Sequence, residues 1–92
     1  MTTRLPISDA SYVAGARREV ESLARAINLG SDEVARAALI ATELSTNLVR
    51  HGGGGQLMVR PLPTASVTGL ELIAIDRGPG IRDVNDSLRD GV

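Results

Sequence analysis

The chain has 92 residues, 42% of them apolar, with one aromatic residue (Tyr12), no cysteine and a formal net charge of -1. The length allows one domain with an aliphatic core, and the lack of cysteine excludes disulfides, thiolate metal sites and a cysteine nucleophile. The chain has no basic field and no aromatic residues between its arginines for base stacking, so we expect no nucleic-acid partner.

Targeting and membrane signals are also missing from the sequence. The first ten residues, MTTRLPISDA, lack the apolar run of a signal peptide, and no stretch approaches the roughly 18 apolar residues of a membrane span. We therefore expect a cytoplasmic protein without a membrane partner. All ten basic residues are Arg, so a P-loop, whose Lys reaches the phosphates, is excluded and any nucleotide site must use another design.

The first third of the chain predicts an edge strand followed by a helix. Residues 4–7 (RLPI) contain a proline and precede a polar pair, which suits the edge of a sheet. Apolar residues then recur at three- and four-residue steps through residues 9–30, the pattern of an amphipathic helix. Ser8 or Asp9 can cap its start, and Gly30 offers a left-handed residue at its end.

A second helix should follow at once and run antiparallel to the first. Ser31 or Asp32 can cap its start, and it should extend from about residue 32 to about residue 50 before the glycines at 52–55 end it. Its predicted apolar stripe consists of Val34, Ala37, Ala38, Ala41, Leu44 and Leu48.

The second half predicts two more strands. Residues 56–60 (QLMVR) form one, and residues 70–76 (LELIAID) form a nearly continuous apolar strand that is covered on both faces or central in a sheet. The nine-residue connection, 61–69, favours an antiparallel hairpin. After the turn at residues 77–80 (RGPG), residues 81–92 could start a short helical turn.

Four polar residues share one face of the second predicted helix. At about 100° per residue, Glu43, Asn47, Arg50 and His51 fall together, with Glu43 and Asn47 at the border of the buried stripe. We expect these two to be half buried, and so either to hydrogen-bond within the fold or to line a cavity that holds a polar ligand. Solvation or local pairing of Glu43 is the alternative, and His51 suits an interaction with the helix dipole.

A second polar group is expected at the end of the apolar strand. Asp76 shares strand parity with Leu72 and Ala74, so its carboxylate should point to the same face as these side chains. An acceptor in an apolar pocket suits the exocyclic amine of a purine, and Gly78 and Gly80 would let the backbone turn beneath a flat ring. An ordinary turn, in which an Asp is followed by Gly and Pro, is the alternative for residues 76–80 (DRGPG).

Together, the two stretches resemble the GHKL superfamily of ATP-binding domains, the Bergerat fold, and more narrowly the anti-sigma-factor type of serine/threonine protein kinase. Residues 42–51 (TELSTNLVRH) are similar to the N box of this family, and residues 76–80 (DRGPG) to its first glycine box. The helix pair before the N box and the strand pair between the boxes are in the expected order.

The resemblance covers essentially the whole chain and implies its fold. The expected structure is a two-layer α/β (α+β) sandwich, in which helices cover one face of a mixed, mostly antiparallel sheet. Because the family continues past an "RDG"-like stretch into an ATP lid and further sheet elements, the resemblance implies a C-terminally incomplete domain. Residues 1–92 would then form a single, partial GHKL ATP-binding domain.

The resemblance also implies a role for each site residue. Glu43 matches the general base, and Asn47 matches the residue that coordinates a Mg²⁺ ion bridging the ATP phosphates. Asp76 would bind the adenine amino group, and Arg50 would face the phosphates. The complete ATP-binding set would be Asn47, Arg50, Asp76, Gly78 and Gly80.

The implied function is Mg-ATP-dependent serine/threonine protein kinase activity. The acceptor would be a protein antagonist or sigma-factor regulator in a partner-switching stress response, and a homodimer could complete the sheet. One alternative is a nucleotide-responsive interaction module that regulates a partner by binding alone. Others are the ATP domain of a histidine kinase or ATPase, and a small α/β domain whose polar residues are only structural.

Overall fold

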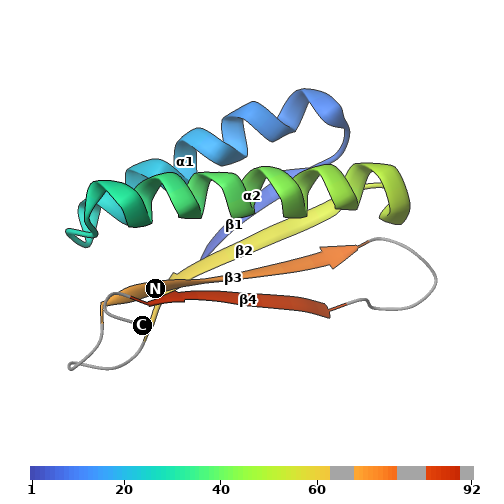
Figure 1. The fold of residues 1–92 in the computed structure, drawn as a ribbon. Coiled ribbons are helices and arrows are strands. Elements are labelled where there is room, and N and C mark those ends of the chain that lie inside the picture. Colours follow the sequence, from blue (N-terminus) through green and yellow to red (C-terminus); the bar gives the residue numbers. More distant parts are fainter. Residues whose placement is uncertain (63–67, 77–82, 90–92) are drawn as a thin grey trace.

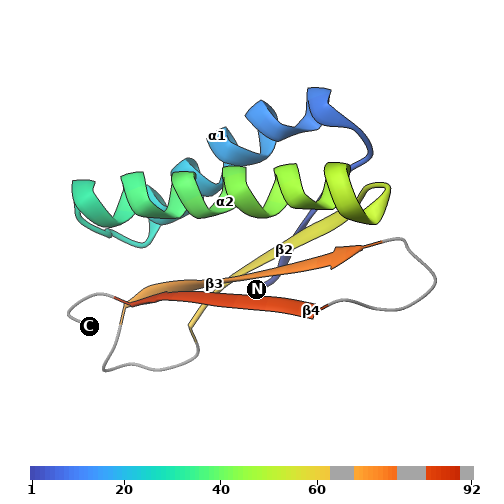
Figure 2. The same ribbon diagram turned by 45° about the vertical axis from the view of Figure 1, so that its right-hand side comes forward.

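The computed structural model describes residues 1–62 and 68–76 in full and residues 83–89 as backbone. Two helices lie side by side on one face of a four-stranded sheet, as two views of the ribbon show (Figures 1 and 2). This arrangement confirms the expected two-layer α+β fold. In chain order the elements are β1 (Thr3–Ile7), the 3-10 helix η1 (Ala10–Tyr12), α1 (Val13–Ala26), α2 (Ser31–Gly52), β2 (Gly55–Pro61), β3 (Gly69–Asp76) and β4 (Asp83–Arg89).

The sheet has the strand order β1-β2-β3-β4, so β1 is an edge strand and β3 is an internal strand, as predicted. The predicted hairpin of β2 and β3 is also confirmed, with Gly55 opposite Asp76 and Pro61 opposite Leu70. Every pairing among the described strands is antiparallel, so the mixed character implied by the resemblance is not seen in this part of the chain.

The predicted helical turn after Asp76 is wrong for residues 83–89, which form strand β4. This strand pairs with β3 from Ile75 opposite Asp83 to Gly69 opposite Arg89. Asp, Asn and Ser are weak strand formers, so local propensity gives little sign of a strand here. Pairing with the open edge of β3 decides the conformation instead, because it satisfies the backbone groups of both strands.

The core is aliphatic and lies between the helices and the inward face of the sheet. Alternate residues of β2 and β3 are buried, as expected for strands that are covered on one face. On the outward face, Arg60 and Glu71 are paired across the strands and form an ion pair. The buried cluster comprises Ile7, Ala16, Val20, Ala24, Leu29, Val34, Ala37, Ala41, Leu44, Leu48, Leu57, Val59, Leu70, Leu72 and Ala74.

The predicted capping residues are partly right. Asp9 caps the start of η1, where its carboxylate accepts hydrogen bonds from the hydroxyl and the backbone N–H of Ser11. These bonds stabilise the charged carboxylate and lower the pKa of Asp9. Gly30 is not the left-handed residue after α1, because Asn28 takes that conformation with φ 64°. Gly30 is instead the N-cap of α2, in place of the predicted Ser31 or Asp32.

Helix α2 buries the predicted stripe together with two residues that the stripe did not include. Ser45 is fully buried, and Gly52 is buried at the last helical position. Ser45 follows Glu43 by two residues, which places it about 200° around the helix and therefore nearly opposite. The buried side of α2 is thus centred farther from Glu43 than the apolar residues alone indicate.

No helix in the described part of the chain combines the length and the hydropathy that crossing a membrane would require.

Candidate functional site

The outer flank of α2 carries a shallow depression of about 470 Å³. Three of the predicted site residues, Glu43, Asn47 and Arg50, line it together. They come from successive turns of one helix, so the helical repeat alone brings them to one side. The complete lining is Thr42, Glu43, Leu44, Thr46, Asn47 and Arg50.

The expected half-burial of Glu43 and Asn47 is wrong, because both side chains are exposed, as is Arg50. Two features of the fold explain the difference. The buried side of α2 is centred nearly opposite Glu43, and no element in the described ranges packs over this flank. The depression is therefore open to solvent along one side of the helix.

Of the two alternatives for these residues, solvation and local pairing, the structure shows solvation, because all three side chains are exposed. Within the described residues, Glu43, Asn47 and Arg50 form neither side-chain hydrogen bonds nor ion pairs. The Thr42 hydroxyl, by contrast, donates to the Ala38 carbonyl at 2.9 Å. The depression thus presents a carboxylate, an amide and a guanidinium whose hydrogen-bonding groups are available to a ligand.

Asp76 lies at the end of β3, on the side of the sheet that faces α2. Its position follows the predicted parity, since Leu70, Leu72 and Ala74 are all buried on that face. The contact is close: a methyl group added to Gly52 would overlap the Asp76 Cβ and lie 3.2 Å from its Cγ. The last turn of α2 therefore rests against this carboxylate.

The structure brings Glu43, Asn47 and Arg50 together, but Asp76 does not line their depression. Gly52, which contacts Asp76, follows Asn47 by five residues, a rise of about 7.5 Å along the axis and a turn of about 140° around the helix. His51, in the last turn of α2, is exposed, and the predicted positions Gly78 and Gly80 lie outside the described residues.

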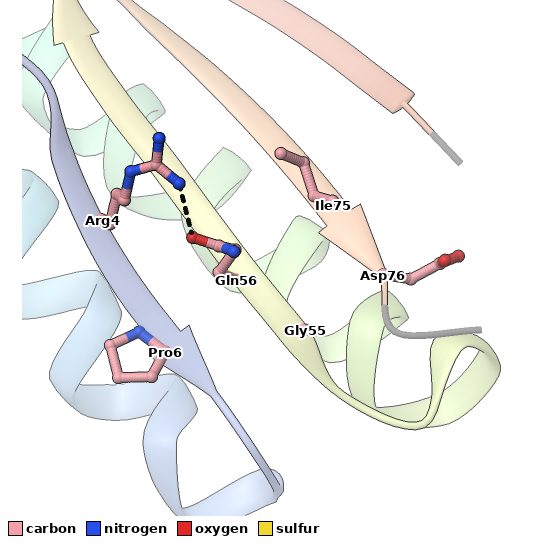
Figure 3. Close-up of a pocket in the computed structure, with 6 residues that line it drawn as sticks. All are labelled: Arg4, Pro6, Gly55, Gln56, Ile75 and Asp76. Carbon is pink, nitrogen blue, oxygen red and sulfur yellow. Dashed lines mark hydrogen bonds between the residues drawn. The ribbon is translucent and has the colours of Figure 1, made fainter. Parts of the chain in front are cut away.

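A second pocket, of about 370 Å³, lies at the ends of β1, β2 and β3. Figure 3 shows Arg4 and Gln56 next to each other on neighbouring strands, and Arg4 Nη1 donates to Gln56 Oε1 at 3.5 Å. Asp76 also lines this pocket, with its side chain pointing away from Arg4 and Gln56 (Figure 3). This pocket is not indicated by any pattern in the sequence, because it depends on the pairing of β1 with β2, which are far apart in the chain.

The donor set of the depression fits a magnesium nucleotide. Mg²⁺ prefers oxygen ligands, keeps several waters and shares phosphate oxygens, so the amide oxygen of Asn47 can serve as a single protein ligand. The Arg50 guanidinium matches phosphate geometry, and the Glu43 carboxylate can accept a proton. Within the described residues, no three His, Cys, Asp or Glu side chains lie close enough to hold a metal alone.

Most of the chain matches one known protein family. Residues 7–92 match the family described as "Histidine kinase-like ATPase domain", and the chain belongs to this family. The chain is also 30% identical over 79 residues to the serine/threonine-protein kinase RsbT of Bacillus subtilis (strain 168). The resemblance inferred from the two boxes is thereby confirmed.

The alignment with RsbT covers 86% of this chain and 59% of the relative, so the chain spans well under two thirds of that kinase. No solved structure gives a significant match to the chain.

Proposed function

We propose that the protein is an ATP-dependent serine/threonine protein kinase of the anti-sigma regulatory type. The main support is the depression on α2, where Glu43, Asn47 and Arg50 lie together without partners among the described residues. The family membership supports ATP as the nucleotide, and the likeness to a serine/threonine-protein kinase supports transfer to a hydroxyl group.

In this proposal each side chain has a separate task. Asp76 accepts a hydrogen bond from the adenine amino group, and Gly78 and Gly80 belong to the proposed ATP-binding set. Asn47 would hold a magnesium ion, which would supply charge neutralisation at the phosphates, and Arg50 would bind phosphate oxygens. Phosphoryl transfer depends mainly on such positioning and charge, so few protein groups are sufficient.

Glu43 is the proposed general base. The hydroxyl of a serine or threonine on the acceptor forms a bond to the γ-phosphorus, the bond from that phosphorus to the ADP oxygen breaks, and Glu43 takes the hydroxyl proton. A domain that only binds nucleotide has less use for a carboxylate beside the phosphates. The open side of the depression is where an acceptor protein could approach Glu43.

The proposed acceptor is a protein antagonist or sigma-factor regulator in a cytoplasmic partner-switching pathway. We further propose that residues 1–92 act as a single ATP-binding domain and that the protein can form a homodimer. An interaction module without transfer activity and a histidine kinase ATP domain are the competing functions. Both are distinguished from the proposal by whether the γ-phosphoryl group of ATP is transferred to a protein, and to which type of residue.

The test measures ATP binding and phosphoryl transfer separately. Calorimetry with and without Mg²⁺ gives the affinity, and γ-³²P-ATP added to a lysate of the source cells gives transfer to protein. We expect Glu43→Gln to retain binding and lose about 10²- to 10⁴-fold in transfer, the usual contribution of a general base. Asn47→Ala should remove the Mg²⁺ dependence of binding, and Glu19→Gln, at an exposed position of α1, should change neither quantity.

The stability of the label in acid separates the competing functions. Phosphoserine and phosphothreonine survive acid, whereas phosphohistidine does not, so an acid-labile product would replace the proposal with a histidine kinase. Mg-ATP binding without labelled protein would favour the interaction module. Equal transfer by the protein and by Glu43→Gln would remove Glu43 from the role of base.

A further inference from the structure

The last turn of α2 and the end of β3 are in direct contact through one glycine. A methyl group added to Gly52 would overlap the Cβ of Asp76 and lie 3.3 Å from its Oδ2. The overlapping atom is at the root of the Asp76 side chain, so a rotation of the carboxylate cannot relieve it. Either the helix end or the strand end would have to move.

The backbone conformation does not explain this glycine. Gly52 lies within the bounds of α2, and the left-handed glycines of the described residues are Gly53 and Gly54. At a helical position Ala is a better helix former than Gly, so helix propensity would favour a side chain here. The space taken by Asp76 is the remaining reason for Gly at this position.

The backbone of Asp76 has a second glycine against it. Gly55 is paired with Asp76 across β2 and β3. A methyl group added to Gly55 would overlap the Ile75 carbonyl oxygen and lie 2.9 Å from the Asp76 Cα. Asp76 is thus bounded by the α carbons of two glycines, one at its side chain and one at its backbone.

From these contacts we infer that Gly52 is a positioning residue, which sets the place of the Asp76 carboxylate and thereby the preference of the site for adenine. The inference rests on the proposed function, because it takes Asp76 as the acceptor of the adenine amino group. A carboxylate displaced by part of an ångström loses the alignment of that hydrogen bond. The phosphate side of the site, around Asn47, is not in contact with Gly52 and should be unaffected.

The experiment compares ATP with inosine triphosphate, which carries a carbonyl oxygen in place of the adenine amino group. The affinity of each nucleotide is measured by calorimetry with Mg²⁺ for the unaltered protein, Gly52→Ala, Asp76→Asn and Gly15→Ala. Gly15 is the matched control, because on α1 a methyl group would meet only the end of Arg18, at 3.9 Å. Thermal melting of each variant shows the fraction that is folded.

We expect the unaltered protein and Gly15→Ala to prefer ATP by tenfold or more, since a site built for one hydrogen-bonding group rejects an analogue that lacks it. Gly52→Ala should lower this preference to less than threefold, mainly through weaker ATP binding. A purely structural role would weaken both nucleotides equally. Gly52→Ala with an unchanged preference would overturn the inference and leave the proposed function intact.

Two further results keep the outcomes apart. If the unaltered protein binds the two nucleotides equally, the proposed role of Asp76 fails, and the inference fails with it. If Gly52→Ala does not fold, the change is repeated together with Asp76→Gly, which removes the overlapping Cβ. The double variant should then melt at the temperature of Asp76→Gly alone. A further loss of stability would show that the methyl group at position 52 overlaps atoms other than the Cβ of Asp76, which would contradict the inference.

Discussion

Helices α1 and α2 end with the same backbone device but in different surroundings. Asn28 follows α1 with φ 64°, and Gly53 follows α2 with φ 68°. After α1, the N–H groups of Asn28 and Leu29 donate to the carbonyls of Arg25 and Ala24, the pattern of a Schellman motif. One left-handed residue is therefore sufficient to end a helix in this chain, and it need not be glycine.

One left-handed residue would be sufficient to end α2, yet four consecutive glycines stand at its end. A methyl group on Gly53 would meet open space, whereas one on Gly54 would lie 2.9 Å from the Ile7 carbonyl oxygen. Gly52 and Gly55 are in contact with β3, as described above. A methyl group would thus meet open space at Gly53 and the sheet at the other three glycines, of which Gly54 also has a positive φ of 94°. Apart from Gly53, the run is therefore a packing surface against β1 and β3.

The largest expected effect comes from filling this packing surface at Gly55. In Gly55→Ala the added methyl group would overlap backbone atoms of β3, which cannot rotate away. We expect the free energy of unfolding to fall by about 1–3 kcal/mol or more, the usual range for overpacking. Urea denaturation measures it, with Gly15→Ala as the control. An unchanged midpoint would mean that β2 and β3 are farther apart here than the structure shows.

A smaller effect of opposite sign is expected inside α2. The buried residues of α1 are all apolar, whereas α2 buries the Ser45 hydroxyl, which has no hydrogen-bond partner among the described residues. Burying an unpaired hydroxyl costs about 1–3 kcal/mol, so we expect Ser45→Ala to raise the free energy of unfolding by about 1 kcal/mol.

Thr42 is the matched comparison for Ser45, because its hydroxyl is paired with the Ala38 carbonyl. Thr42→Val should lower the stability, by about 0.5–1.5 kcal/mol, since it removes a hydrogen bond that is made. Thermal melting of both variants checks that Ser45→Ala raises the stability and that Thr42→Val lowers it. A loss of stability in Ser45→Ala would show that the hydroxyl has a partner.

The elements that the sequence predicted correctly are those whose signal is local. The 3.6-residue period located both helices, and the apolar runs located β2 and β3, because each pattern is set by the side that faces the core. The same helical period predicted that Glu43, Asn47 and Arg50 share one face of the helix, and in the structure they line one depression. Their roles in binding and transfer stay predictions.

The missed features depend on contacts between segments that are distant in the chain. Strand β4 forms because β3 offers an open edge, and its own residues carry little strand signal. The exposure of Glu43 depends on which side of α2 the rest of the fold covers. The contact of Gly52 with Asp76 depends on where the helix end comes to rest on the sheet. None of these can be derived from the period of a single element.

The smallest effects should come from substitutions at two of the left-handed residues, Asn28 and Gly53. Asn28→Gly and Gly53→Asn each keep a residue that tolerates positive φ, and a side chain on Gly53 would meet open space. We expect each change to alter the free energy of unfolding by no more than about 0.5 kcal/mol, as for a surface substitution. Urea denaturation of the two variants beside Gly52→Ala gives the comparison. A loss at Gly53→Asn as large as that at Gly52→Ala would show that the whole run is packed, and the distinction between Gly53 and the three packing glycines would then be wrong.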